Sequence, residues 1–184
     1  FDSSGVMSKP WEEAGYTVRR FDIDKGQDLT DFSMWMTQIE EDMEEGYEVY
    51  GVFGQPPCTS YTVSGNRYWA THHNPPDRKM VEKSYGAWAS KRFEKPLDYA
   101  NTLVAVVKLF IAQSNPKGFY AMENPIGRVN EQNGLPTPLL KFDPHNFGDP
   151  YTKQTQIWGE FDPNLPLANV EPSQGSLIHK LRGD

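Results

Sequence analysis

The sequence predicts a three-layer α/β fold, with a mostly parallel sheet covered by helices on both faces. Short apolar runs alternate with longer amphipathic stretches, and no internal repeat, low-complexity tract or linker interrupts this alternation. Strands that alternate with helices favour parallel pairing, because each helix returns the chain to the same end of the sheet. A length of 184 residues suits one domain with its own core. We therefore expect residues 1–184 to form a single domain.

The first predicted elements are short. Phe1 is expected to be the last residue of a strand, and residues 9–14 predict a helix that stops at Gly15. Residues 17–21 then form a β-type run that ends at Asp22. We expect a strand, a helix and a second strand in this order.

Two stronger patterns follow. Residues 31–45 carry apolar side chains at helical spacing and end before Gly46, and residues 49–53 form an apolar run that predicts a strand. Residues 54–77 are typical of a long polar and aromatic loop, after which Asp77 begins a helix-like stretch. The apolar face of the first of these helices would consist of Phe32, Trp35, Met36, Ile39 and Met43.

The clearest helix of the chain spans residues 97–113, because its apolar side chains form one wide stripe. Residues 119–122 predict a strand directly after it, and residues 155–161 form a later β-type run. The chain between Pro125 and that run is rich in proline and glycine. The buried stripe of the helix would consist of Leu97, Ala100, Leu103, Val104, Val107, Phe110 and Ile111.

Composition bounds the class of protein. No apolar stretch approaches the roughly 20 residues that a membrane-spanning helix needs, so we expect no membrane association. The single cysteine cannot form an internal disulfide, which favours a reducing, cytoplasmic setting. The formal net charge of −7 argues against tight, sequence-independent phosphate binding by the chain as a whole. The adjacent His72 and His73 have no second cluster of ligands, so we expect no metal site.

The chemically reactive side chains follow two predicted strands. Cys58 lies in the segment QPPCTSYTVSG after one strand, and Glu123 and Asn124 follow another. The carboxyl ends of parallel strands meet at one edge of a sheet, where ligands of such sheets bind. A thiol and a carboxyl that meet there suit nucleophilic addition to a ring that can accept a proton.

Taken in order, these segments resemble the DNA cytosine-5 methyltransferases, which use S-adenosylmethionine. PPCTSYTVSG is similar to the family's nucleophile motif, and ENP at 123–125 is similar to its Glu-Asn-Val motif, with proline in the third place. FDSSG near the amino terminus, FDID at 21–24 and QDLTD at 27–31 resemble its cofactor-binding segments. The resemblance covers most of residues 1–127 and implies the Rossmann-like fold of class I methyltransferases.

The resemblance implies a catalytic role for each matching residue. Cys58 would add to carbon 6 of cytosine, since a thiolate is soft and partly ionised near neutral pH. Glu123 would hydrogen-bond or protonate N3 of the ring, and Asn124 would orient Glu123 or Pro57. The family's paired arginines are replaced within YTKQTQIWG at 151–159, where only a lysine and a threonine are carried over. The catalytic candidates are Pro57, Cys58, Glu123, Asn124, Lys153 and Thr155.

S-adenosylmethionine is the cofactor that the resemblance implies. Gly5 would let the backbone pass close to the ligand, although the family's loop usually carries more glycines than FDSSGV. Asp22 would accept both ribose hydroxyls, and Asp28 would accept from the adenine amino group. The expected cofactor-binding residues are Phe1, Asp2, Ser3, Gly5, Asp22, Ile23, Asp28 and Pro57.

DNA is the implied substrate. A cytosine inside a duplex cannot reach such a site, so the enzyme would flip the base out or use single strands. Residues 160–184 leave no room for the family's target-reading domain, so we expect a compact, phage-like form in a bacterial or phage-infected cell, with a partner protein or a loop reading the target. The loop after the cysteine would contact phosphates and stack on bases. Its candidates are Ser60, Ser64, Arg67, Tyr68 and Trp69.

Two alternative functions stay open. A thymidylate-synthase-like enzyme would also place a nucleophilic cysteine after prolines, but it acts on free nucleotides. A non-catalytic regulator would explain the missing arginines, the few glycines and the missing target-reading domain, whereas intact Cys58 and Glu123 oppose it. An amino-group methyltransferase is disfavoured, because the segment NPPD at 74–77 lacks the expected aromatic residue and does not follow a strand.

Overall fold

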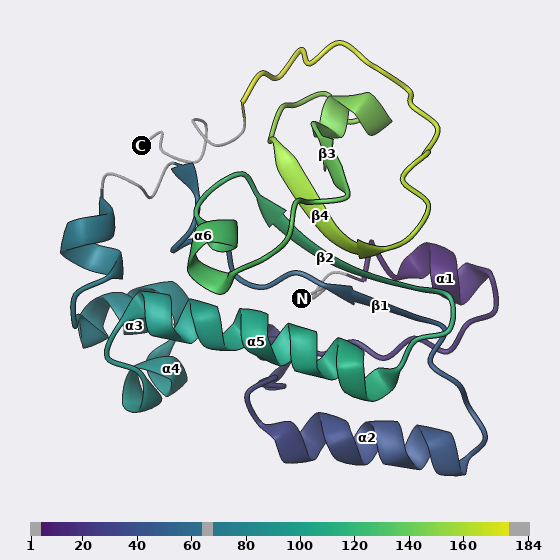
Figure 1. Cartoon of the computed structure of the whole chain (residues 1–184), viewed down its shortest axis with the longest axis horizontal. Coiled ribbons are helices and arrows are strands. Elements are labelled where there is room, and N and C mark those ends of the chain that lie inside the picture. The colour runs from purple at the N-terminus through teal and green to yellow at the C-terminus, as the bar shows by residue number, and fades with distance from the viewer. Residues whose placement is uncertain (1–4, 64–67, 177–184) are drawn as a thin grey trace.

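The computed structural model describes residues 5–63 and 68–176, which fold as an α/β structure around one sheet (Figure 1). Phe1, the predicted end of a strand, lies outside the described residues. The four strands lie in the order β1-β2-β4-β3. Their bounds are β1 (Gly51–Gly54), β2 (Phe119–Pro125), β3 (Leu140–Phe142) and β4 (Thr155–Glu160).

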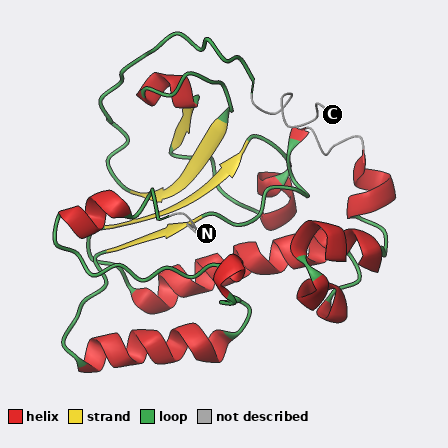
Figure 2. Ribbon diagram, turned by 180° about the vertical axis from the view of Figure 1, so that it is seen from behind, coloured by secondary structure: helices red, strands yellow, loops and turns green. Residues whose placement is uncertain are grey.

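Most of the helices lie on one side of this sheet, and Figure 2 shows the strands lying together beside the longest helix, α5. Short helical turns connect several of them. The α-helices are α1 (Lys9–Glu13), α2 (Phe32–Glu44), α3 (Arg78–Tyr85), α4 (Ala87–Arg92), α5 (Pro96–Ser114) and α6 (Val129–Asn133). The short turns are η1 (Ile23–Lys25), η3 (Trp69–His73) and η4 (Pro144–Phe147).

The described sheet is mixed, and the prediction of a mostly parallel sheet was wrong. β1 and β2 are parallel, whereas β4 runs antiparallel to both β2 and β3. Residues 17–21, predicted as a strand, form no strand, and β1 is the edge of the sheet. A cavity of about 960 Å³ is lined by these residues and by β1. Segment 17–21 has the β-type side chains of a strand. Backbone pairing, however, requires a neighbouring strand about 4.8 Å away.

Helix α5 organises the core, because both of its sides are covered. Its sheet-facing side packs with Met122 of β2 and Trp158 of β4. Its other side packs with α2, α3 and α4. Helix α2 begins after Asp31 and ends at Glu44, close to the predicted bounds, with two buried residues facing α5. This arrangement explains why the sequence of α5 is apolar around most of its circumference.

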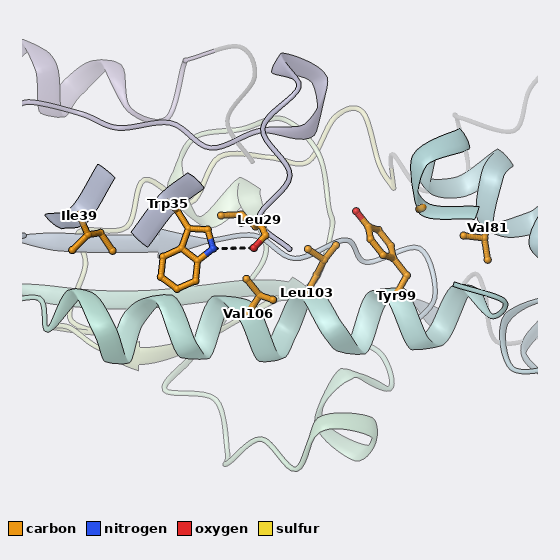
Figure 3. Packing of buried hydrophobic residues seen from close by; sticks show 8 residues of the cluster. Leu29, Trp35, Ile39, Val81, Tyr99, Leu103 and Val106 are labelled. Carbon is orange, nitrogen blue, oxygen red and sulfur yellow. Dashed lines mark hydrogen bonds between the residues drawn. The ribbon is translucent and has the colours of Figure 1, made fainter. Parts of the chain in front are cut away.

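Trp35 fixes α2 against α5. Figure 3 shows its ring in the cluster between the two helices, together with Ile39, Leu103 and Val106. The indole Nε1 donates a hydrogen bond to the carbonyl of Leu29, 2.9 Å away, so its polar atom is satisfied in the interior. The segment before α2 is thereby held over the helix pair.

Candidate active site

The parallel register of β1 and β2 brings the two predicted motifs together. Gly54 pairs with Met122, so the residues that come next, Gln55 and Glu123, are neighbours. The side-chain amide of Gln55 donates to Oε2 of Glu123 at 3.4 Å. Glu123 lies inside β2 rather than after it, because the strand continues to Pro125 by pairing with β4.

The segment after β1 is anchored by Asn124. Its side-chain amide donates to the carbonyl of Pro56 at 2.8 Å, and Asn124 is fully buried. That carbonyl belongs to Pro56, two residues before the cysteine. Asn124 therefore positions the backbone that carries Cys58, and no bond from it to Glu123 is recorded among the described residues.

Cys58 opens a tight turn. Its carbonyl accepts from the backbone N–H groups of Tyr61 at 2.8 Å and Thr62 at 3.0 Å. The turn is also held by the loop after β2, because Thr62 bridges to Gly127 and the N–H of Arg128 donates to the carbonyl of Tyr61 at 2.8 Å. The thiol itself is half-buried. Two loops from different strands thus fix its place.

The start of β4 brings a positive charge to the same site. Asn124 pairs with Gln156 and Pro125 with Thr155, so Lys153 lies beside the end of β2. The Thr155 hydroxyl donates to the carbonyl of Lys153 at 2.7 Å, and Thr155 is buried. Thr155 therefore shapes the backbone at Lys153, with its own hydroxyl engaged inside the chain.

Electrostatics show that thiol, carboxyl and ammonium groups share this site. Burial raises the pKa of the Cys58 thiol, the charge of Lys153 opposes that rise, and the charge of Glu123 adds to it. Burial also raises the pKa of Glu123, while Lys153 and the hydrogen bond from Gln55 lower it. Burial therefore opposes the charged form of both the thiol and the carboxyl, and the charge of Lys153 favours the charged form of both.

The predicted cofactor-binding residues that the structure describes lie in the segments before α2 and after β1. Gly5 has φ +73°, and a Cβ there would lie 3.3 Å from the guanidinium carbon of Arg20. Asp22 is buried, and its carbonyl accepts from the N–H groups of Lys25 and Gln27. Ile23 is exposed and Pro57 half-buried. Phe1, Asp2 and Ser3 lie outside the described residues.

Asp28 has one engaged and one unsatisfied oxygen. Its Oδ1 accepts from the N–H and the hydroxyl of Thr30, at 2.8 and 2.9 Å. Its Oδ2 and the neighbouring Oε1 of Gln27 are buried without a hydrogen-bond partner in the described part of the chain. Buried acceptors in this condition suit a ligand that brings hydrogen-bond donors.

The large cavity adjoins this region through Phe21 and Leu29, but the predicted cofactor residues do not line it. None of Gly5, Asp22, Ile23, Asp28 or Pro57, which are the predicted cofactor residues within 5–63, lines it. Its walls include the extended segment 17–21, the edge strand β1 and side chains of α2 and α5. The cavity results from the missing strand pairing at this edge, and we do not assign the cofactor to it.

The predicted nucleic-acid contacts are divided between surface and interior. Tyr68 is exposed and lies 5.5 Å from the ring of His72, and Trp69 lies under the guanidinium of Arg128 at 4.6 Å. Ser60, in contrast, is only 1% exposed, so the structure places it in the interior rather than on a binding surface. Ser64 and Arg67 lie outside the described residues.

The structure adds residues that the sequence analysis did not select. Gln55 contacts Glu123, Arg128 stacks on Trp69, and both Tyr85 and His73 contact the Ser60 hydroxyl. Gln55 could have been found from its place at the end of a strand. The other contacts join residues from separate loops and helices, which sequence spacing does not indicate.

The chain has no metal cluster in its described part and no recognised relative. Within 5–63 and 68–176 no group of three or more His, Cys, Asp or Glu side chains could hold a metal ion. The helices in these ranges are also too short or too polar to cross a membrane. Neither models of known protein families, nor curated proteins, nor solved structures match the chain. Function must therefore be inferred from the residues and their arrangement.

Proposed function

We propose that this chain transfers a methyl group from S-adenosylmethionine to carbon 5 of cytosine in DNA, through a covalent bond between Cys58 and carbon 6. The observation that carries the proposal is the register of β1, β2 and β4, which brings the segments of Cys58, Glu123 and Lys153 to one end of the sheet. The three residues come from segments far apart in the chain and meet because β1, β2 and β4 end or begin at one place.

Each side chain has a defined task in this reaction. The Cys58 thiol loses its proton to solvent, which the positive charge of Lys153 favours, and the sulfur then bonds to carbon 6 while Glu123 gives its proton to N3. Carbon 5 then accepts the methyl group and loses its proton to solvent. The bond between sulfur and carbon 6 breaks, and N3 returns its proton to Glu123. Burial raises the pKa of Glu123, which is the direction that a proton donor to N3 needs.

S-adenosylmethionine, when bound, supplies an electrophilic methyl group. The acidic side of the expected site fits this ligand, because Oδ2 of Asp28 and Oε1 of Gln27 are buried acceptors with no partner in the described residues, and the adenine amino group donates. Asp22 would accept the ribose hydroxyls. Gly5 fits less well, since the Arg20 side chain already packs against it.

Aromatic and basic groups beside Cys58 support a nucleic-acid substrate. Trp69 and Arg128 form a stacked pair where the loops after β1 and β2 meet, and Tyr68 is exposed nearby along the chain. Exposed aromatic and guanidinium faces stack on unpaired bases. The proposal therefore favours DNA with a flipped or single-stranded cytosine, with a partner protein supplying target recognition.

The proposal includes the three-layer, Rossmann-like arrangement of the resembling family. The parallel pairing of β1 and β2 and the α5 helix packed on them support it. The extended segment 17–21 would belong to the same sheet in that arrangement, on the far side of the cavity beside β1.

Covalent trapping tests the proposal. We would incubate the protein with S-adenosylmethionine and single-stranded or duplex DNA containing 5-fluorocytosine, in which carbon 5 cannot lose a proton. A cross-linked product is expected for the wild type and for Glu160→Gln, a change on the exposed end of β4. Cys58→Ser should give none, and Glu123→Gln should give much less. Parallel incubation with dCMP separates DNA modification from an enzyme of free nucleotides.

One observation favours a second candidate function, a methyltransferase-like regulator without activity. The Arg20 guanidinium packs against Gly5, where the family's loop approaches its cofactor. Binding of nucleic acid without any cross-link to Cys58, on DNA or RNA, would favour this regulator over the enzyme.

A further inference from the structure

An arginine and a tryptophan form a stacked pair beside the Cys58 turn. The guanidinium carbon of Arg128 lies over the Trp69 ring, 4.6 Å from its centroid. The two residues come from different loops, since Trp69 begins η3 in the segment after β1 and Arg128 directly precedes α6 after β2. An aromatic face attracts a cation, so the ring restricts where the guanidinium can lie.

The backbone of Arg128 is bonded to the turn that carries the thiol. Its N–H donates to the carbonyl of Tyr61 at 2.8 Å, and the N–H of Tyr61 donates to the carbonyl of Cys58 at 2.8 Å. Thr62 bridges to Gly127, so two consecutive residues of the loop after β2 pair with two of the turn. These backbone contacts place Arg128 next to the turn of the proposed nucleophile.

The Trp69 ring is a fixed support for the guanidinium. It packs against the buried cluster that contains Tyr61 and Val129, which lies between α5 and the sheet. Trp69 and Arg128 are both half-buried, so each is held by the protein and still partly exposed. A side chain that is ordered before its ligand arrives loses less conformational entropy on binding.

The chemistry of this pair suits a phosphate group. A guanidinium whose face lies over a ring still has N–H groups along its edge, and their spacing matches two oxygens of one phosphate. The chain as a whole has a formal net charge of −7, so its overall field repels phosphate. Binding of a nucleic acid by this chain therefore depends on single cations held at the site itself.

We propose that Arg128, held by Trp69, binds the DNA backbone phosphate beside the cytosine that Cys58 attacks. This inference rests on the proposed function, and it adds which group of the substrate is contacted and by which residue. Contacts to phosphate fix the position of a nucleic acid strand without reading its sequence. Arg128 would hold the strand next to the Cys58 turn whatever the neighbouring bases are, and no bond forms or breaks in this step.

The salt dependence of binding tests the contact. We would measure the affinity for a fluorescein-labelled single-stranded DNA that contains one cytosine, by fluorescence anisotropy, over a series of sodium chloride concentrations. Each phosphate contact on a single strand contributes about 0.7 to the slope of log affinity against log salt concentration. Arg128→Gln should reduce the slope by about this amount and lower the affinity at low salt about tenfold.

Arg92→Gln is the matched control. Arg92 lies over the Trp88 ring at 4.9 Å, so it forms the same kind of pair, but on α4, which packs on the other side of α5. Both variants lose one positive charge, and Arg92→Gln should keep the slope and affinity of the wild type. An Arg128→Gln protein with native circular dichroism and the slope of this control would overturn the inference, as would a wild type that does not bind the DNA.

Chemical protection in the wild-type protein covers an Arg128→Gln variant that fails to fold. Phenylglyoxal modifies accessible guanidinium groups, and peptide mass mapping reports each arginine separately. The same DNA should protect Arg128 and leave Arg92 reactive, whereas deoxycytidine, which has no phosphate, should protect neither. Equal modification of Arg128 with and without the DNA overturns the inference.

Trapping on 5-fluorocytosine distinguishes this inference from the proposed function. A cross-link to Cys58 in the wild type, together with an unchanged slope in Arg128→Gln, rejects the phosphate contact alone. A reduced slope without any cross-link rejects methyl transfer alone, because a protein that only binds DNA would make the same phosphate contact.

Discussion

The buried side-chain amide of Asn124 donates to the carbonyl of Pro56 across 2.8 Å, although 68 residues separate the two in the chain. This bond joins the end of β2 to the segment that carries Cys58. It also gives the Pro56 carbonyl a donor, because an unmet backbone carbonyl in the interior is costly. Asn124 therefore holds the segment of Cys58 against the strand of Glu123 without itself taking part in the proposed reaction.

Asn124→Ala should destabilise the protein by about 1–3 kcal/mol, because it leaves the Pro56 carbonyl buried without a donor. Urea unfolding followed by circular dichroism measures the loss. Asn164→Ala is the control: Asn164 is exposed and bonds only locally to Asp162, so less than about 0.5 kcal/mol is expected. Equal losses in the two variants would show that the Pro56 bond contributes nothing.

Lys153→Gln should make Cys58 less reactive near neutral pH. The lysine's positive charge lowers the pKa of the thiol, so its removal leaves burial and the Glu123 charge to raise that pKa further. The thiolate fraction should fall, and with it the rate of Cys58 alkylation by iodoacetamide, which rises with pH to a plateau where the thiol is fully ionised. Lys117→Gln, an exposed change before the opposite end of β2, should leave the rate unchanged. If Lys153→Gln did not lower the alkylation rate, Lys153 would not act on the Cys58 thiol.

Glu123→Gln should stabilise the protein near pH 8. Burial raises the pKa of Glu123 in the folded state above its unfolded value, so the folded state binds more proton between these two values. Stability is therefore retained below about pH 4 and lost as pH rises through the folded pKa. The neutral glutamine avoids that loss.

Urea unfolding near pH 4 and near pH 8 checks the sign for Glu123. The advantage of Glu123→Gln should be present at the higher pH and shrink at the lower one, and both lie below the raised pKa of Cys58. Glu160→Gln, at the exposed end of β4, should show no such difference. If the wild type were more stable than Glu123→Gln near pH 8, the attraction of Lys153 would stabilise the charged carboxylate by more than its burial costs.

The long helices could be predicted from the sequence because helical periodicity is a local signal. Residues 97–113 and 31–45 were expected to be helical, and the structure has α5 at Pro96–Ser114 and α2 at Phe32–Glu44. Strands depend on distant partners instead. The segment 17–21 has β-type side chains but no strand, and β3 forms only by pairing with β4.

The candidate site, too, could be predicted from the sequence only in part. The neighbourhood of Cys58 and Glu123 could be expected, because Cys58 follows β1, Glu123 lies near the carboxyl end of β2, and these two strands pair in parallel. The burial of Ser60 could not, since its partners His73 and Tyr85 lie 13 and 25 residues away on other elements. A hydroxyl in a polar loop resembles a surface contact until the elements that cover it are known.

Gly127 should tolerate no side chain, because its backbone lies against the Cys58 turn. A Cβ at Gly127 would collide with the carbonyl oxygen of Tyr61, and that carbonyl cannot retreat without losing its bond from the N–H of Arg128. Gly127→Ala should therefore cost at least about 2 kcal/mol in urea unfolding. It should also raise the plateau rate of Cys58 alkylation, since the turn loses its support.

Gly134→Ala separates this contact from the general cost of replacing glycine. Gly134 has φ +57°, and a methyl group there would meet no atom within 4 Å, so only backbone strain of about 1 kcal/mol is expected, with Cys58 alkylation unchanged. If Gly127→Ala cost no more than this control and left the plateau rate alone, the loop after β2 would not be what holds the cysteine in place.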